Sequence, residues 1–117
     1  MKPAVIKEQI TVEDLNKVDV RVGTIEAVED IRDSEKLVRL LDDFGDHKRT
    51  IVAGLKQERA DPTVIEGKQA LFVVNLATRK IHGVMSQGML FDIGYADGVQ
   101  PVLGVPESTV PSGTRAG

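Results

Sequence analysis

The sequence VDVRVGTIEA occupies residues 18–27 and indicates how the fold begins. Apolar and charged residues alternate from Val18 to Val22, as in a strand with one buried face. The apolar residues then move from even to odd positions, and Gly23 stands at the junction. A glycine where the period of two slips by one residue indicates a bulge or a sharp coil. We therefore expect a long first strand that is bulged or coiled at this glycine.

Further short strands are expected at regular spacing after the first. Their apolar centres lie at residues 37–41, 50–53, 70–74 and 89–93. The sequence FGDH at residues 44–47 is typical of a hairpin turn between the second and third strands. The C-terminal tail is apolar but interrupted by Pro101 and Pro106, which predicts one or two short edge strands there.

Two short helices complete the expected elements. Thr11 is suited to cap a helix over residues 11–15, and Asp14 can return a hydrogen bond as in a capping box. Residues 56–59 are expected to form a helical turn that Asp61 and Pro62 end. Together these segments predict an all-β OB-fold. It is a five-stranded Greek-key barrel with a short N-terminal helix, a short helix between strands 3 and 4, and C-terminal edge strands.

Length and composition limit the possible classes of protein. A chain of 117 residues predicts one domain, which we place at residues 11–117 after a flexible segment at residues 1–10. No apolar run approaches the roughly 18 residues of a membrane span, so no membrane association is expected. The chain has no cysteine. This excludes a disulfide framework, a thiolate metal site and a cysteine nucleophile, and it fits a cytoplasmic protein.

Residue patterns of enzymes are missing from the sequence. His47 and His82 lie in different loops and lack metal-ligand spacing. Ser86 lacks the glycine two residues earlier that a nucleophile elbow requires. Asp42 and Asp43 are interpreted as part of a solvated turn rather than as a general acid and base. We therefore expect no enzymatic activity, no metal ion and no cofactor.

The distribution of charge favours a polyanionic partner despite the net charge of −3. Residues 47–91 hold seven basic and three acidic residues. Within them, residues 67–91 contain Lys68, Arg79 and Lys80 and no acid at all. Binding to a nucleic acid depends on the local potential rather than on the molecular sum. The central segment is therefore the expected binding region.

A polar, basic loop follows the most apolar strand, in a position where binding sites are commonly presented. Arg79 can hold a phosphate with two hydrogen bonds, and Lys80 supplies a mobile charge. Asn75 can read a base edge or fix the loop. The alternative is an ordinary exposed loop in which Asn75 satisfies backbone groups.

Three further residues are candidates for contact with RNA. Lys36 lies near the mouth of the second strand, and Ser86 offers an uncharged hydrogen-bond donor before the fifth. Met89 can pack under a base or fill the core. The ordinary position for four other cations is a solvated face: Lys48, Arg49, Lys56 and Arg59.

Aromatic residues are too few for a stacking platform. The chain has three phenylalanines and one tyrosine, and Phe72 and Phe91 are expected to be buried. Sequence-independent binders of single strands rely on stacking of about 1–3 kcal/mol per base. Recognition here is expected to depend on shape, phosphates and sugar hydroxyls, which suits a folded RNA.

Five segments, in register, carry a family resemblance. They are KVDVRVGTI at residues 17–25, SEKL at 34–37, KRTIVAGL at 48–55, VNL at 74–76 with Arg79 and Lys80, and GVMSQGML at 83–90. In order and spacing they resemble the tRNA-binding domain found in three settings. These are the C-terminus of many methionyl-tRNA synthetases, small free-standing proteins, and endothelial-monocyte-activating-polypeptide-like proteins.

The resemblance implies a function as well as a fold. It implies structure-specific binding of tRNA by an OB-fold homodimer, auxiliary to an aminoacyl-tRNA synthetase and without a part in aminoacylation. The positions that match the family's binding face are Lys36, Asn75, Arg79, Lys80, Ser86 and Met89. Three residues of the first strand match a signature that we connect to dimer and fold geometry: Asp19, Arg21 and Gly23.

Two other functions stay open on the same barrel. A sister branch of the family resembles an export-related chaperone that binds unfolded polypeptide, and a third possibility is a docking module that only holds a synthetase complex together. The basic loop at Arg79 and Lys80 favours tRNA, because a chaperone would display an exposed apolar patch. Residues 30–35 depart from the family by lacking its His-Pro-Asn-Ala-type loop.

Overall fold

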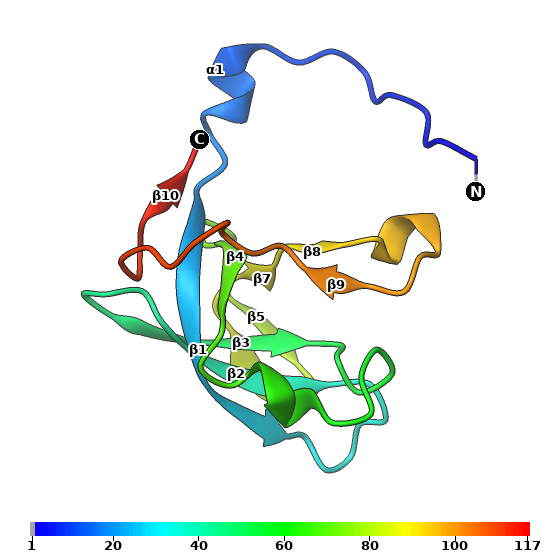
Figure 1. Ribbon diagram of the computed structural model, residues 1–117, viewed down its shortest axis with the longest axis vertical. Helices are drawn as coiled ribbons and strands as arrows, with labels where there is room; N and C mark the ends of the chain where they lie inside the picture. Colours follow the sequence, from blue (N-terminus) through cyan, green and yellow to red (C-terminus); the bar gives the residue numbers. More distant parts are fainter. Residues whose placement is uncertain (1) are drawn as a thin grey trace.

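The computed structural model describes residues 2–117, and one antiparallel sheet in it curls into a nearly closed barrel (Figure 1). The strand order is β3-β2-β1-β4-β7. The strands are β1 (Val20–Asp30), β2 (Val38–Asp43), β3 (Lys48–Ala53), β4 (Gln69–Val73) and β7 (Met89–Leu90). The long β1 pairs with β4 over its first half and with β2 over its second. The predicted five-stranded OB-fold barrel is confirmed.

The bulge in β1 lies three residues beyond the glycine at which it was expected. The register with β2 shifts between Ile25 and Ala27, so the extra residue is Glu26 rather than Gly23. Gly23 has a different purpose. A Cβ there would lie 2.9 Å from the Phe44 ring and 3.0 Å from the Phe72 ring. The glycine therefore makes room for these two rings, which pack edge to face with centroids 5.5 Å apart.

Side-chain atoms complete the barrel where β3 meets the segment before β7. The Val52 amide donates to Ser86 Oγ at 3.0 Å, and the Thr50 amide donates to Gln87 Oε1 at 3.0 Å. The Gln87 amide in turn donates to the Thr50 carbonyl at 2.8 Å. These bonds satisfy edge groups of β3 that would otherwise be left unpaired. The Ser-Gln pair thus acts as a short substitute for a strand.

One carboxylate lies in the apolar interior. Along β2, Val38, Leu40 and Asp42 alternate inward, and Asp42 is 0% exposed. Neither carboxylate oxygen of Asp42 has a hydrogen-bond partner. Burial, with a smaller contribution from repulsion by Glu26, raises the pKa of Asp42 to about 8. The expectation that Asp42 belongs to a solvated turn is wrong, because the strand continues through Asp43 before the turn begins.

The first helix has the predicted cap, and a separate 3-10 helix follows the predicted helical turn after β3. In α1 (Val12–Leu15) the Asp14 amide donates to Thr11 Oγ1 at 3.0 Å, and the Asp14 carboxylate returns the bond. The helix between β3 and β4 is a 3-10 helix, η1 (Pro62–Ile65). The predicted helical turn at residues 56–59 is present, because the Glu58 and Arg59 amides donate to the Leu55 carbonyl at 3.2 and 3.1 Å. Asp61 and Pro62 do not end that turn but start the separate η1 helix. Asp61 accepts from the Thr63 amide, and proline suits a first helical position.

The fifth predicted strand is two short strands that serve different sheets. Met89 and Leu90 form β7, whereas β8 (Asp92–Ile93) pairs with β9 (Val102–Leu103). A second 3-10 helix, η2 (Tyr95–Asp97), lies between them. Phe91 stands at the change of sheet and is 48% exposed, so its predicted burial is wrong. The predicted C-terminal edge strands are present, since β10 (Arg115–Ala116) also pairs with β1.

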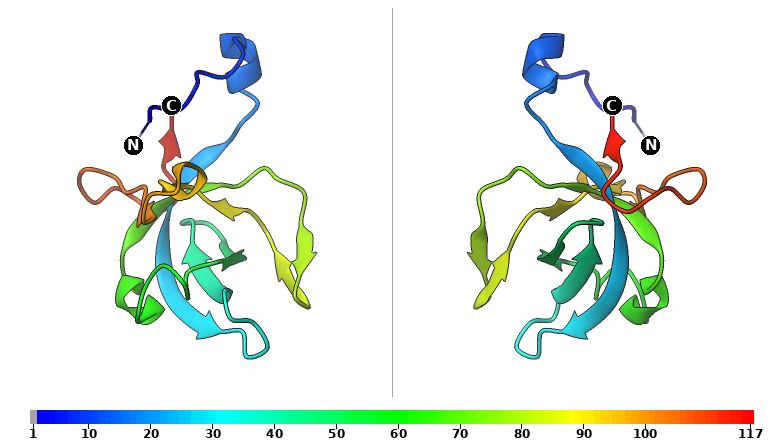
Figure 2. Two further views of the ribbon diagram at one scale, coloured as in Figure 1. Left: turned by 90° about the vertical axis from the view of Figure 1, so that its right-hand side faces the viewer. Right: turned by 90° about the vertical axis from the view of Figure 1, so that its left-hand side faces the viewer.

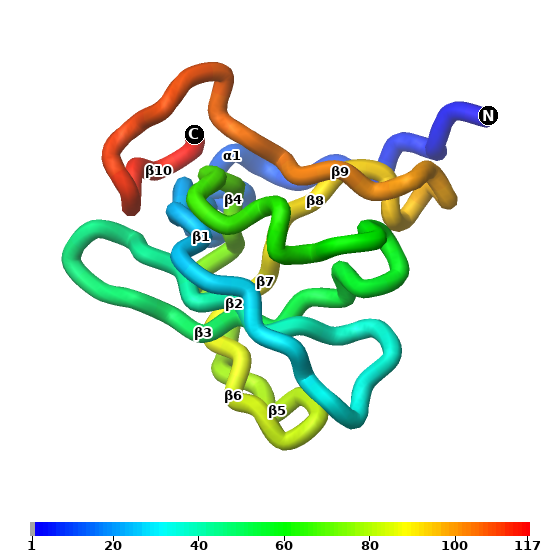
Figure 3. Tube along the Cα trace, turned by 60° about the horizontal axis from the view of Figure 1, so that its bottom comes forward, coloured from blue at the N-terminus to red at the C-terminus, as the bar shows by residue number. Residues whose placement is uncertain are grey.

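The two ends of the barrel differ in what they carry. Helix α1 and the C-terminus lie at one end, while β5 (Arg79–Ile81) and β6 (Val84–Ser86) project at the other, near the β1–β2 connection (Figure 2). The same arrangement is visible in the trace of Figure 3. Residues 2–10 lie outside helices and strands and are exposed. Their predicted flexibility stays a prediction.

Candidate nucleic-acid interface

The expected basic loop is a hairpin. Its strands β5 and β6 are joined by two residues, His82 and Gly83, with φ angles of +50° and +82°. Positive φ at both central residues is the pattern of a type I′ turn, whose twist matches that of the flanking strands. Glycine adopts this region freely and histidine is among the residues enriched in it. The His-Gly pair was therefore the sequence signal for a hairpin.

The register of the hairpin separates its two cations. Arg79 pairs with Ser86 and Lys80 pairs with Met85. Neighbouring residues of a strand point to opposite faces, so Arg79 lies on the face of the buried Ser86 and Lys80 on the outer face with Met85. Both cations are exposed, and neither is in any ion pair within residues 2–117. They are available to a phosphate from two sides of the hairpin.

Lys36 is exposed in the connection between β1 and β2. This connection lies at the same end of the barrel as the hairpin (Figure 2). Ser34 Oγ accepts from the amides of Lys36 and Leu37 at 3.2 and 3.0 Å. Lys56 Nζ donates to the carbonyls of Ile31 and Ser34 at 2.9 and 2.6 Å, and it also pairs with Asp30. Lys56 is thus a clamp on this connection rather than a solvated charge, and it helps to position Lys36.

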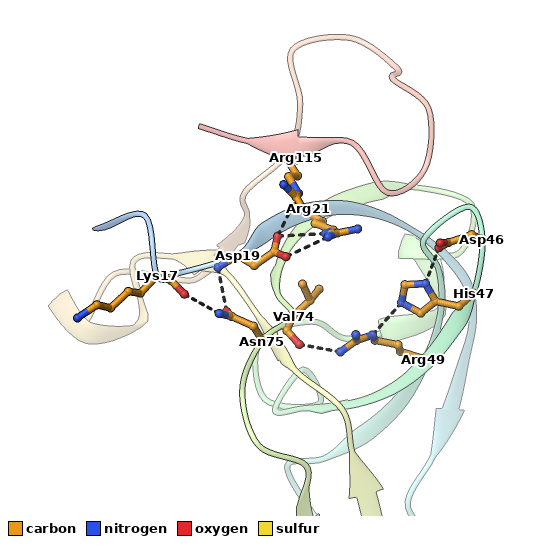
Figure 4. Close-up of polar contacts among 9 residues, drawn as sticks. All are labelled: Lys17, Asp19, Arg21, Asp46, His47, Arg49, Val74, Asn75 and Arg115. Carbon is orange, nitrogen blue, oxygen red and sulfur yellow. Dashed lines mark hydrogen bonds and ion pairs between the residues drawn. The ribbon is translucent and has the colours of Figure 1, made fainter. Parts of the chain in front are cut away.

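Asn75 lies near the opposite end and is occupied by the backbone (Figure 4). Its Oδ1 accepts from the Asp19 amide at 2.8 Å, and its Nδ2 donates to the Lys17 carbonyl at 2.5 Å. These bonds join the chain entering β1 to the chain leaving β4. The alternative interpretation of Asn75, satisfaction of backbone groups, describes what this side chain does.

The first-strand signature ties the C-terminus to β1. Arg21 donates to both oxygens of Asp19 at 3.0 Å, and Arg115 of β10 lies 3.9 Å from the same carboxylate. The hydrogen bond from Arg21 is the main reason that the pKa of Asp19 is lowered. This arrangement serves fold geometry, in agreement with one of the two uses expected for these residues.

The Arg49 side chain helps to close the barrel. Its Nη1 donates to the carbonyls of Val74 and Gln87 at 2.7 and 2.9 Å, and its Nε lies 3.0 Å from His47 Nε2 (Figure 4). The guanidinium stands 6.0 Å from the centre of the Phe44 ring. No local sequence pattern indicated this role, since a cation at the start of a strand ordinarily faces water.

The last two candidates differ in exposure. Ser86 is 3% exposed, and its hydroxyl both accepts from Val52 and donates to the Gly88 carbonyl at 3.2 Å. Met89 is 47% exposed, so the alternative that it fills the core is wrong. Met89 and Lys36 line the same pocket. The structure therefore brings Lys36 and Met89 together, places Arg79 and Lys80 on the nearby hairpin, and uses Ser86 and Asn75 internally.

A small five-stranded barrel of this topology places the chain in the class of OB-fold domains, and its hairpin adds exposed cations. The family model described as "Putative tRNA binding domain" matches residues 20–115, and the chain belongs to this family. It is a tRNA-binding domain similar to a region of methionyl-tRNA synthetases.

Relatives of known name are similar over almost the whole chain. The methionine–tRNA ligase of Archaeoglobus fulgidus is 39% identical over 93% of this chain, which spans 16% of the ligase. A crystal structure of a MetRS related protein from Pyrococcus horikoshii superposes with a TM-score of 0.85 at 37% identity, covering 94% of this chain and 99% of that one. The crystal structure of the chaperone CsaA from Bacillus anthracis superposes with a TM-score of 0.80 at 26% identity, covering 94% of this chain and 100% of that one.

Two other kinds of site were sought in the described part of the chain. Among residues 2–117, no group of three or more histidine or acidic side chains could hold a metal ion. No helix within the same residues is long and apolar enough to cross a membrane.

Proposed function

We propose that this domain binds tRNA at the end of the barrel that carries the β5–β6 hairpin and the β1–β2 connection. We call this surface the cationic end and define it by Lys36, Arg79 and Lys80. The hairpin carries the proposal, because it projects with two exposed cations that no carboxylate of residues 2–117 neutralises. Such cations displace condensed counterions from RNA, so the affinity should fall steeply with salt.

The other candidates contribute to this proposal in two ways. Met89 is exposed beside Lys36 and is available for an apolar contact with RNA. Ser86 and Asn75 support the surface indirectly, by closing the barrel and by joining β1 to the chain after β4. We assign RNA contact to Lys36, Arg79, Lys80 and Met89.

We further propose that the domain is a non-catalytic, cytoplasmic auxiliary of an aminoacyl-tRNA synthetase of the methionyl type. The supporting observation is the similarity to a methionine–tRNA ligase over only 16% of that protein's length. A separate tRNA-binding surface would raise the affinity of such an enzyme for tRNA through effective concentration, without touching the reacting atoms.

We also propose a homodimer formed through an apolar end, opposite the hairpin (Figure 3). Five apolar residues on α1, the chain before β1, and the β8–β9 pair are at least 48% exposed: Val12, Leu15, Val18, Ile93 and Val102. Exposed apolar side chains gathered at one end of a domain are typical of an interaction site. A second copy would bury it and would place two cationic ends on one assembly, which multiplies the affinity for a large RNA.

The proposal is tested by fluorescence anisotropy with total tRNA and with a single-stranded RNA of equal length, at low and moderate salt. Saturable, salt-sensitive binding that is tighter for tRNA is the expected result. Flat curves with both RNAs contradict it. The double variant Arg79→Ala/Lys80→Ala should lose affinity, whereas Lys17→Ala removes a similarly exposed charge at the opposite end and should not.

A chaperone is the second candidate, supported by the structural similarity to CsaA and by the exposed apolar end. Suppression of the aggregation of an unfolded test protein would favour it. This activity should disappear in a Leu15→Glu variant and persist in Arg79→Ala/Lys80→Ala. For the tRNA function, Arg79→Ala/Lys80→Ala should instead lower the affinity for tRNA directly.

A further inference from the structure

An open pocket of about 330 Å³ lies beside the cationic end. Its walls come from the β1–β2 connection, the chain after β3, and the segment from β7 to η2. Leu55 and Leu90 are buried and form apolar wall, and Met89 and Tyr95 present exposed side chains at its edge. Small-molecule sites begin at about 300 Å³ and combine apolar walls with a few polar groups. The pocket therefore has the size and lining of a site for a small, flat guest.

Two carboxylates line this pocket without a partner. Glu58 and Asp92 take no part in an ion pair within residues 2–117. Burial raises the pKa of each carboxyl, and the charge of Asp92 raises that of Glu58 further. Smaller opposing contributions come from Arg59 at Glu58 and from the backbone at Asp92. The two groups are close enough to repel one another, and no side chain among residues 2–117 donates a hydrogen bond to either carboxylate. A bound molecule with N–H donors would hydrogen-bond to the carboxylates and would reduce the repulsion between them.

Lys36 lines the same pocket and is likewise in no ion pair among the described residues. This lining selects the kind of guest. A basic side chain of a polypeptide would satisfy the carboxylates but would meet the Lys36 ammonium, and a bare phosphate would meet the carboxylates. A nucleotide carries both complements, because its base presents N–H donors on a flat ring and its phosphate is negative.

We propose that the pocket receives one unstacked nucleobase of the bound RNA, with guanine preferred. Glu58 and Asp92 would accept hydrogen bonds from the base, and Lys36 would contact the adjacent phosphate. Guanine presents an imino N–H and an amino group side by side, which one carboxylate can accept together. Adenine and cytosine offer only the amino group, and uracil offers no amino group. This inference rests on the proposed function, since it requires the RNA to approach the cationic end.

The first test uses the protein with ¹³C-labelled methionine methyl groups, titrated separately with GMP and UMP and followed by NMR. The Met89 signal should shift with GMP and much less with UMP, while Met85 on the hairpin should not respond. Both nucleotides carry the same phosphate, so the difference isolates the base. No shift of Met89, or equal shifts with both nucleotides, overturns the inference. A shift with a lysine-rich peptide but not with GMP also overturns it.

The second test separates the pocket from the general electrostatics. Removing a negative charge near RNA ordinarily strengthens binding. Glu58→Gln and Asp92→Asn should instead weaken tRNA binding, by about tenfold for the loss of a good base contact. Glu35→Gln, an exposed acid of the β1–β2 connection, is the matched control and should bind equally well or better.

The two possible failures are distinguishable. If the unaltered protein binds tRNA and Glu58→Gln behaves like Glu35→Gln, the pocket inference is overturned while the proposed function stands. If the unaltered protein does not bind tRNA, the proposed function fails. The GMP titration then still decides whether the pocket takes a base.

Discussion

The apolar end and the cationic end of this barrel differ in how much of their shape depends on the protein alone. The hairpin at the cationic end has its own cross-strand pairing and a two-residue turn, and its cations need no internal partner. At the apolar end, α1 has no buried residue, and its apolar side chains Val12 and Leu15 are exposed. The cationic end is therefore formed without a ligand. The apolar residues of the other end could be buried only by a partner.

The difference follows from how each end is held. The β5–β6 hairpin is anchored on β3 through Ser86 and Gln87, so it is part of the closure of the barrel. The helix α1 is joined to the barrel mainly through the Asn75 amide and the short link before β1. Preformed charged surfaces suit RNA, because the phosphate pattern is rigid. Loosely held apolar surfaces suit a protein partner, because burial itself supplies the ordering energy.

The largest expected effect concerns the barrel that separates the two ends. Asp42 is neutral in the folded protein below its raised pKa of about 8, and its ordinary pKa is near 4. The folded state therefore holds a proton that the unfolded state releases. The contribution of this group to stability is fully present below pH 4 and is lost by about 1.4 kcal/mol per pH unit as the pH rises toward 8.

An Asp42→Asn variant should remove this slope. Its free energy of unfolding, measured by urea denaturation, should match the unaltered protein at pH 4 and exceed it by several kcal/mol at pH 8. Its tRNA affinity and its dimerisation should be unchanged at pH 7, because Asp42 reaches neither end. A parallel pH dependence in both proteins would mean that Asp42 is ionised and solvated. If Asp42→Asn altered only the tRNA affinity or only the dimerisation, the core around Asp42 would be coupled to that end of the barrel.

The second effect is at the cationic end. Reversing both charges in Arg79→Glu/Lys80→Glu should lower tRNA affinity on the order of 100-fold, since two phosphate contacts become repulsive. The slope of log affinity against log salt should decrease by about 2. Thermal stability should stay within about 0.5 kcal/mol, because both side chains are exposed. Equal losses of stability and affinity would return the hairpin to a purely structural role.

The third effect is at the apolar end. Leu15→Glu should weaken self-association by about 2 kcal/mol for each copy, because it replaces a leucine that the dimer would bury with a charge. Sedimentation equilibrium measures the dissociation constant directly. The affinity for tRNA should fall with it through lost multivalency, while Lys17→Ala should change neither quantity. A protein that is monomeric before any substitution would contradict the proposed dimer.

The sequence was most informative where one residue served one purpose. Strand alternation predicted the barrel, and Thr11 with Asp14 predicted the first helix. The sequence did not predict the features in which a side chain hydrogen-bonds to backbone groups in place of a neighbouring strand. Ser86 and Gln87 do this along β3. Arg49 does it at the carbonyls of Val74 and Gln87. Their partners are more than 20 residues away in sequence, so no local pattern encodes them. The burial of Asp42 was missed for the same reason, because an acidic pair before a turn ordinarily faces water.

The smallest effect tests whether the cationic end is preformed. His82 holds a φ of +50°, which costs a β-branched residue about 1–2 kcal/mol. His82→Val should therefore loosen the hairpin turn and weaken tRNA binding severalfold, although no charge at Arg79 or Lys80 changes. His82→Asn is the matched control, because asparagine tolerates positive φ and should retain the affinity. Hydrogen exchange of the amides in β5 and β6 reports the turn directly. If exchange accelerates in His82→Val without any change in tRNA affinity, the RNA itself orders the hairpin, and the two ends resemble each other in needing a partner.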